Sequence, residues 1–204
     1  MPIASSGWVL LISKIFPCII FEPRYLSMVR DAIASPHRLI GMIQSYDDAD
    51  EQGRAGALYD IGCAGRISSF SESDDGRVMI TLSGTTRFRR LEDHEVEDGY
   101  RLAQVSWADF EADLAPVADT IQRDHLVSVL HDYFKIKGFT ADWDQLDDCE
   151  DERLVTTLSM ICPFDVPEKQ ALLEANSLPD RTQLLIAILE MASHSDSDEA
   201  GARH

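Results

Sequence analysis

The side chains that most often do chemistry in proteins are scattered along this sequence. His125 and His131 lie on one expected helix, but a spacing of six residues places them on different faces, which disfavours joint binding of a metal. The sequence has no Gly-x-Ser-x-Gly nucleophile turn and no Gly-x-x-x-x-Gly-Lys phosphate loop. We therefore expect no catalytic residue, no metal site and no cofactor.

Two charged clusters could still bind a ligand. Residues 141–152 hold seven acids and no base, but they lack the residue order and the glycine turn of a calcium-binding EF-hand loop. This segment is expected to be a solvated loop. Arg87, Arg89 and Arg90 could form a cationic patch for a carboxylate ligand, but the acids at 92–98 favour mutual neutralisation.

The cysteines and the apolar N-terminal run bear on the compartment. The sequence has four cysteines, with no Cys-x-x-Cys pair, which is typical of reduced thiols in the cytoplasm. Residues 8–21 are very apolar, but no base precedes them, and Lys14 and Pro17 interrupt them. This pattern argues against a signal peptide or a membrane span and predicts two short buried strands.

Composition and charge exclude several classes of partner. The chain has 204 residues and a formal net charge of −18. An acidic surface disfavours nucleic acids and anionic membranes, because both attract basic proteins. Residues 1–110 hold 11 bases and 16 acids, whereas residues 111–204 hold 7 and 20. The acidity is therefore concentrated in the C-terminal half.

Hydrophobic patterning divides the chain into a strand-rich part and a helical part. Asp75-Gly76 predicts a hairpin, and glycines at 62, 65 and 84 predict bulges in a small, curved barrel. Apolar spacing after Pro23 predicts one helix, with Tyr25 and Met28 on its buried face. The expected strands are 8–12, 18–21, 38–44, 61–70, 78–82, 87–91 and 100–107.

The C-terminal part is predicted to be helical. The expected helices are 116–137, 153–162, 168–176 and 180–193. We predict a β-rich domain over residues 1–112, a helical domain over residues 113–193 and a disordered tail over residues 194–204.

Several motifs resemble one known family. Ile20-Phe21-Glu22-Pro23-Arg24-Tyr25-Leu26 is similar to a signature of the Lon N-terminal (substrate-binding) domain family. The likeness continues through 59–67, 82–89 and 163–174, and it covers about residues 7–192. The resemblance implies an α+β fold: a PUA-like pseudo-barrel with one helix, followed by a helical bundle. The chain looks like a stand-alone bacterial member that lacks the ATPase and protease modules.

The resemblance also implies a function. It favours a non-catalytic module that binds exposed segments of unfolded or partly folded polypeptides. A protease or chaperone is a further candidate partner. The chain is expected to be a monomer or a weak homodimer. A hydrolase-like enzyme and an RNA-binding PUA-like module are the alternatives. The candidate binding residues are Phe21, Glu22, Pro23, Arg24 and Tyr25. A second candidate location is the junction between the two parts, near residues 108–120.

Overall fold

The structure, a computed structural model, describes residues 1–5, 10–11, 15–46, 56–74, 76–115 and 120–201. The chain divides into a β-rich unit, Met1–Pro116 with Pro163–Leu173, and a helical unit, Val117–Cys162 with Glu174–His204. The mixed α+β fold class is confirmed. The division groups residues 163–173 with the strands, whereas the boundaries predicted from the sequence place them with the helices.

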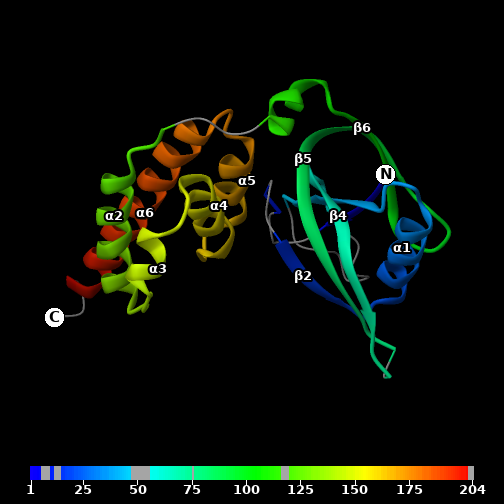
Figure 1. The fold of residues 1–204 in the computed structure, drawn as a ribbon, viewed down its shortest axis with the longest axis horizontal. Coiled ribbons are helices and arrows are strands. Elements are labelled where there is room, and N and C mark those ends of the chain that lie inside the picture. The colour runs from blue at the N-terminus through cyan, green and yellow to red at the C-terminus, as the bar shows by residue number, and fades with distance from the viewer. Residues whose placement is uncertain (6–9, 12–14, 47–55, 75, 116–119, 202–204) are drawn as a thin grey trace. The chain divides into compact units, whose positions relative to one another are not determined.

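A six-stranded sheet forms the β-rich unit (Figure 1). Its order is β2-β5-β4-β3-β1-β6, and β6 also pairs with β5. This second pairing closes five of the strands into a ring, which leaves β2 attached beside it. The strands are β1 (Pro2–Ser5), β2 (Ile15–Ile20), β3 (Leu39–Ile43), β4 (Ile61–Glu72), β5 (Val78–Glu95) and β6 (Arg101–Ser106).

The long strand β5 makes the closure possible. Its residues 78–89 pair with β4, and its residues 89–95 pair with β6. The sequence predicts two strands here, separated near Gly84, but the structure has one strand with a register shift between Ala64 and Gly65 of its partner. A bulge bends a strand without ending it, so the glycine that suggested a break marks a bend.

The first strand was wrongly located by the sequence pattern. Strand β1 lies at Pro2–Ser5, where it pairs in parallel with β3 and antiparallel with β6. In the predicted strand 8–12, Leu10 and Leu11 are buried but in no regular element, and the other residues lie outside the described residues. A four-residue strand carries too short a pattern to be recognised, and its pairing partners are distant in sequence.

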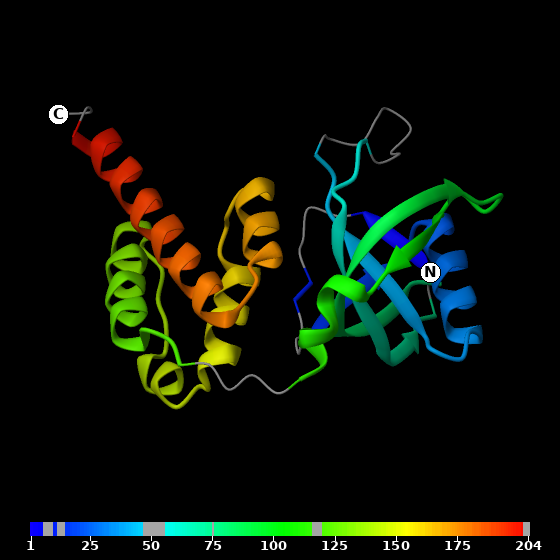
Figure 2. The same ribbon diagram turned by 90° about the horizontal axis from the view of Figure 1, so that it is seen from above.

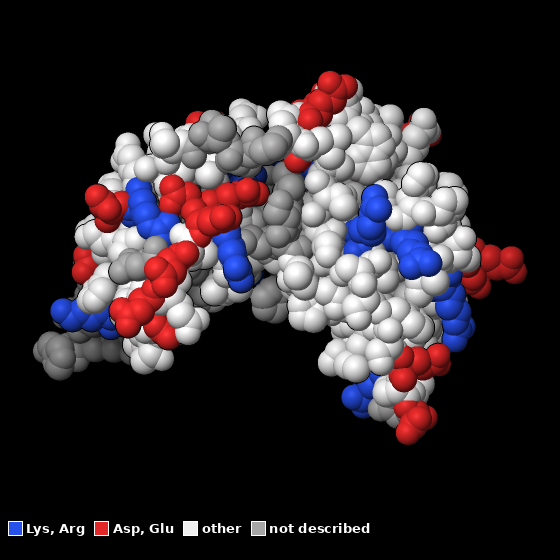
Figure 3. Space-filling view, in the orientation of Figure 1, with Lys and Arg blue, Asp and Glu red and all other residues white. Residues whose placement is uncertain are grey.

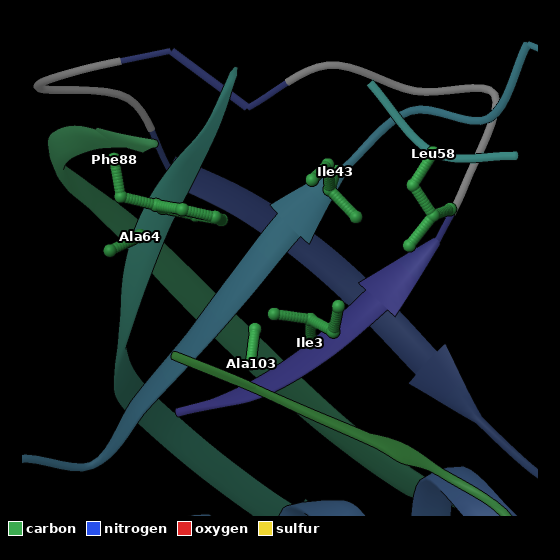
Figure 4. Packing of buried hydrophobic residues seen from close by; sticks show 6 residues of the cluster. All are labelled: Ile3, Ile43, Leu58, Ala64, Phe88 and Ala103. Atoms are coloured by element: carbon green, nitrogen blue, oxygen red, sulfur yellow. The ribbon is translucent and has the colours of Figure 1, made fainter. Parts of the chain in front are cut away.

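Apolar side chains from several strands meet inside the ring (Figure 4). Gly41 and Gly62 leave space for the Phe88 ring: a Cβ built on either glycine would lie 2.9 or 2.6 Å from Phe88 Cζ. Close packing of this kind makes the identity of both residues a steric requirement. The cluster comprises Ile3, Ile43, Leu58, Ala64, Phe88 and Ala103.

Helix α1 (Pro23–Ala34) agrees with the predicted helix. Pro23 is in its first turn, where the missing N–H costs nothing, and Met28, Val29 and Ala32 are buried. The Ser35 hydroxyl donates to the Ala32 carbonyl at 2.8 Å, where the helix ends. The helix packs against β1 and β3.

In the helical unit, α2 (Arg123–Lys137) and α6 (Leu178–Gly201) lie side by side (Figures 1 and 2). Between them in sequence come α3 (Trp143–Asp147) and α4 (Asp151–Ile161). Helix α6 reaches Gly201 through most of the segment for which the sequence predicts disorder; that stretch contains no proline, and its first glycine is Gly201. Core side chains include Leu126, Leu130, Tyr133, Leu154, Leu185 and Leu189.

Two further elements complete the chain. The 3-10 segment η1 (Ala108–Leu114) follows β6, and helix α5 (Val166–Glu174) lies for the most part in the β-rich unit. Gln170 Nε2 donates to the Ile61 carbonyl at 2.9 Å, which ties α5 to β4. No helix among the described residues is long and apolar enough to cross a membrane.

Candidate functional site: the β2 strand and its pocket

Strand β2 is apolar on both of its faces. Its side chains alternate between exposed and half-buried positions along the strand. On the outward side, Ile15 is 69% exposed, Ile19 is 61% exposed, and Phe21, just past the strand, is 67% exposed. An antiparallel strand with one solvated face normally carries polar residues there. Folding alone therefore does not explain why these exposed positions carry apolar side chains. Exposed apolar patches are typical of contact surfaces.

The same strand is an edge of the sheet. Among the described strands, β2 pairs with β5 and with no other. Pro17 lies opposite Thr81 in the middle of an unbroken register. Because proline has no N–H, a regular antiparallel ladder accepts it only where its nitrogen faces away from the partner strand. By the two-residue period, Ile15 and Ile19 also direct their main-chain N–H and C=O away from β5.

A pocket of about 260 Å³ lies behind β2. The inward side chains of β2 form one wall, and α1, β1, β3 and β5 supply the others. The lining is mainly apolar, with one carboxylate, Glu22, at the start of α1. Its residues are Ala4, Ser5, Phe16, Cys18, Ile19, Ile20, Glu22, Tyr25, Met28, Ile40, Met42, Ile80 and Leu82.

The start of α1 contributes an organised polar cluster to this pocket. Arg24 Nη2 lies 2.8 Å from a carboxylate oxygen of Glu22, and its Nε donates to the same oxygen at 3.0 Å. The Arg24 guanidinium also lies 4.7 Å from the centroid of the Tyr25 ring. The ion pair and the cation–π contact orient Tyr25, whose side chain is half-buried and lines the pocket.

The pocket holds no activated nucleophile at its cysteine. Burial raises the pKa of the Cys18 thiol to about 11, so that it stays protonated at neutral pH. A protonated thiol is a poor nucleophile and a poor metal ligand. No group of three or more His, Cys, Asp or Glu residues in the described part of the chain is arranged to hold a metal ion. What the pocket offers is apolar contact beside main-chain groups of β2 that pair with no other described strand.

The five residues predicted as a binding site lie in different surroundings. Glu22 and Tyr25 line the pocket, and Arg24 is held between them. Phe21 and Pro23 are exposed. The sequence also predicts Tyr25 and Met28 to be buried; Met28 is, at 2% exposed, but Tyr25 is only half-buried because it faces the pocket.

Sequence reasoning located β2 in part but missed its position at an edge. The predicted strand 18–21 overlaps β2 (Ile15–Ile20), but it was expected to be buried, since unbroken apolar stretches usually belong to the interior. The available signal was Pro17, which restricts a strand to an edge or a bulge. An edge strand that is apolar on both faces cannot be fully buried by its own sheet.

The arginine-rich stretch of β5 is not an anion site. Arg87 binds Asp113 of η1 through Nε at 3.0 Å and Nη2 at 2.7 Å, and Arg89 Nε binds Asp109 of η1 at 2.7 Å. Arg90 pairs with Asp93 on its own strand at 2.7 Å. Arg90 also binds Asp60 at 3.0 Å. Neutralisation is confirmed, but of the four partner carboxylates only Asp93 was predicted, and two of the others come from η1. Within the expected junction at 108–120, residues 116–119 lie outside the described residues.

Comparisons with known proteins agree on one family. The family of the ATP-dependent protease La (LON) substrate-binding domain matches residues 2–191. A Lon protease of Azorhizobium caulinodans is 23% identical over 147 residues, which are 70% of this chain and 17% of that protein. The chain therefore spans about a sixth of the length of that relative.

Two solved structures share the fold. A Lon N-terminal domain protein from Xanthomonas campestris has a TM-score of 0.64 at 23% identity and covers 92% of this chain and 96% of its own. The N-terminal domain of a Mycobacterium avium complex Lon protease has a TM-score of 0.60 at 14% identity, with 93% and 97% covered. At these identities the likeness concerns the fold alone.

Proposed function

Because the chain belongs to the family of the LON substrate-binding domain, we propose that it is a non-catalytic module that binds exposed segments of other polypeptides. The observation that carries this proposal is the apolar edge strand β2 beside its pocket. The matched family is the substrate-binding part of Lon and not its catalytic part, which supports a role in binding without chemistry.

The proposed mode of binding is strand addition. An extended segment lies along β2 and exchanges main-chain hydrogen bonds with the outward groups of Ile15 and Ile19 and with the Pro17 carbonyl. Main-chain bonds do not depend on side chains, so many sequences are accepted. Side chains of the segment alternate between the outward apolar face and the pocket, where Tyr25 is the aromatic contact.

The edge of β2 lacks most of the devices that keep proteins from pairing through their sheets. Such edges normally carry charged residues, bulges or covering loops. Among the described residues β2 carries Pro17 alone, and its neighbour Ile19 lies opposite Met79 of β5, which is 48% exposed. Figure 3 shows few charged side chains over this part of the β-rich unit. An edge that lacks charged residues and bulges within β2 itself supports its use by a partner.

The expected clients are unfolded or partly folded polypeptides. We further propose that an ATP-dependent protease or a chaperone receives them, because the Lon relative is named a protease and this chain carries no phosphate loop of its own. No disulfide joins the cysteines of the described residues, which supports the cytoplasm as the compartment.

The experiment uses a substitution that removes one hydrogen-bond donor. In the variant Ile19→Pro, the outward N–H is lost while the ladder to β5 is kept, since position 19 has the same parity as Pro17. Ile19→Ala is the matched control: it loses the same apolar side chain and keeps the N–H. Binding of a fluorescently labelled peptide of alternating Val and Ser is measured by anisotropy for both variants and the natural chain.

Strand addition predicts that Ile19→Pro binds more weakly than Ile19→Ala, by roughly fivefold, as for one net hydrogen bond of about 1 kcal/mol. Equal affinities for the two variants would exclude main-chain pairing at this edge. Unaltered binding by both would exclude β2 as the site. Casein cleavage or ATP hydrolysis by the purified chain, lost on a point substitution in it, would refute the non-catalytic assignment.

A further inference from the structure

The helical unit holds a second, larger depression. A groove of about 890 Å³ runs between the end of α2, α3 and α4, and its lining falls within residues 134–161. Its floor is apolar: Leu154 and Leu158 are buried there, and Phe134 and Leu146 are half-buried. The groove is thus wide enough for the side chains of a bound segment and lies in a different unit from β2.

Exposed apolar side chains stand at the edges of this groove. Phe139 is 45% exposed, and Ile161, the last residue of α4, is 63% exposed. Phe139 is fixed by its ring contacts, at 5.7 Å between centroids with Phe134 and 6.2 Å with Tyr133. A rigid aromatic side chain at the edge of an apolar depression is typical of a helix-binding groove.

The rim of the groove is acidic. Asp142 and Asp148 line it, and they belong to the segment 141–152, which holds seven acids and no base. The lining also contains one base, Arg153, at the start of α4. Figure 3 shows acidic side chains gathered over the part of the helical unit where α3 and α4 lie in Figure 1.

The wall that carries these acids is held in place. Arg123 of α2 donates to the carbonyls of Leu146 and Cys149 at 2.6 and 2.8 Å, and it binds the Asp151 carboxylate at 2.5 Å. The Asp142 carboxylate accepts the Gln145 N–H at 3.2 Å and so caps α3. The acidic segment is therefore a formed wall of the groove, so little ordering is needed when a ligand binds.

From this combination we propose that the groove binds a short amphipathic helix of a partner protein whose apolar face carries Leu-like side chains and whose flanks carry Lys or Arg. The apolar floor accepts the Leu-like side chains, and the acidic rim attracts the Lys or Arg side chains. A second copy of this chain is a poor occupant, because two molecules of charge −18 repel each other. The assignment is independent of strand addition at β2.

The probe is a labelled helical peptide of Leu and Lys, and its counterpart has Glu in place of every Lys. We expect the natural chain to bind the Lys peptide and not the Glu peptide. Affinity for the Lys peptide falls as salt rises, since the rim charges act across water and are screened within about 10 Å at 0.1 M salt.

Two variants test the groove, each with a matched control. Ile161→Ser removes an exposed side chain from the groove, and Met191→Ser removes one from α6 that is 67% exposed and outside it. Asp148→Lys reverses a rim charge, and Asp132→Lys reverses an exposed charge on α2. We expect each groove variant to weaken binding about tenfold and each control to change it less than about twofold.

Several outcomes overturn the proposal: binding of the Glu peptide as tight as that of the Lys peptide, equal losses in the groove and control variants, or self-association of the chain that Ile161→Ser abolishes. Chemical-shift changes on peptide addition should fall within residues 134–161. Ile19→Pro should leave the affinity for the Lys peptide unchanged, so that failure of one site is separable from failure of the other.

Discussion

The two units use their charged residues in different ways. In the β-rich unit, buried or half-buried charges are paired: Arg87 with the distant Asp113, and Arg90 of β5 and Arg101 of β6 with Asp93 of β5. In the helical unit, the segment 141–152 has acids and no base, and Arg123 neutralises one of them. Charge in the first unit is therefore used to pair buried groups, whereas in the second most of it remains on the surface.

This difference follows from how each unit is built. A closed sheet brings residues distant in sequence into one interior, where an unpaired charge is very costly. Helices keep neighbours in sequence close together and turn polar residues outward, so that like charges accumulate at the surface. The same contrast appears in the two proposed sites. The site on β2 uses main-chain hydrogen-bonding groups, whereas the groove of the helical unit uses charged side chains.

The largest effect is expected from Arg87→Ala. The Arg87 and Asp113 side chains are only 7% and 5% exposed, and Arg87 Nη1 also donates to the Leu173 carbonyl at 3.2 Å. Removing the arginine leaves a buried carboxylate unpaired, so the free energy of unfolding should fall by about 3–5 kcal/mol. Urea denaturation measures the change.

Arg89→Ala is the matched control for this prediction. Arg89 is two residues away on the same strand and pairs with Asp109 of the same 3-10 segment, but the two side chains are 43% and 51% exposed. An exposed pair contributes about 0–1 kcal/mol. Similar losses for both variants would show that burial does not distinguish the charges of this unit.

Gly62→Ala should have the next largest effect. A Cβ at this position would lie 2.6 Å from the Met42 carbonyl oxygen and 2.6 Å from Phe88 Cζ. Relieving this overlap should cost about 1–3 kcal/mol of unfolding free energy. In the helical unit, Gly138 has a φ of +69° and open space where a Cβ would stand, so Gly138→Asn should be nearly neutral. Thermal melts measure both variants. A larger fall in melting temperature for Gly138→Asn than for Gly62→Ala would contradict this explanation.

A pH-dependent effect of smaller size is expected at Tyr100. Its hydroxyl donates to Asp31 Oδ2 at 2.5 Å, and this hydrogen bond, together with burial, raises the pKa of Tyr100 from 10.0 to about 12. The neutral tyrosine is thus favoured in the folded state. Its contribution is complete below pH 10 and is lost as the pH rises from 10 to about 12.

The variant Tyr100→Phe tests this linkage. It should lower the unfolding free energy by about 1 kcal/mol at neutral pH, the usual net value of a hydrogen bond. The deficit relative to the natural chain should shrink between pH 10 and pH 12. A deficit that stays constant through that interval would mean that the Tyr100–Asp31 bond does not control the titration.

The smallest effect is expected from Asp142→Ala, which removes the cap of α3. A lost cap typically costs about 0.5–2 kcal/mol, and the lower end applies because α3 has five residues. Hydrogen exchange should be faster at the Gln145 N–H and unchanged in the core of the β-rich unit. Global destabilisation instead would show that the acidic wall supports more of the fold than its surface position suggests.

Much of the fold was predictable because its signals are local. Pro23 with the apolar spacing that follows defined α1, and Asp75-Gly76 lies between β4 and β5, where the Ser73 N–H donates to the Arg77 carbonyl at 2.9 Å. The predicted family is confirmed over residues 2–191. What failed was β1, a short strand whose position depends on its neighbours β3 and β6.

The candidate site was predicted only in part. The segment Phe21–Tyr25 was identified, and two of its residues line the pocket. Pro17 alone signals that the preceding strand lies at an edge or a bulge. The sequence does not choose between these two, because the number of partners of a strand is a property of the sheet. It also suggested a loop where Asp142 caps a short helix, since one capped turn among many acids is a weak pattern.

Composition and local pattern by themselves determined the acidity, the order of the strand-rich and helical parts and the position of α1, and the order of several motifs carried the resemblance to the family. These properties depend on residue type and on neighbours within a few positions. Tertiary structure alone decided that β2 pairs with one of the described strands, that the partners of Arg87 and Arg89 come from η1, and that α5 joins the strands. Each of these depends on which distant segments meet, and closing the sheet is what brings those segments together.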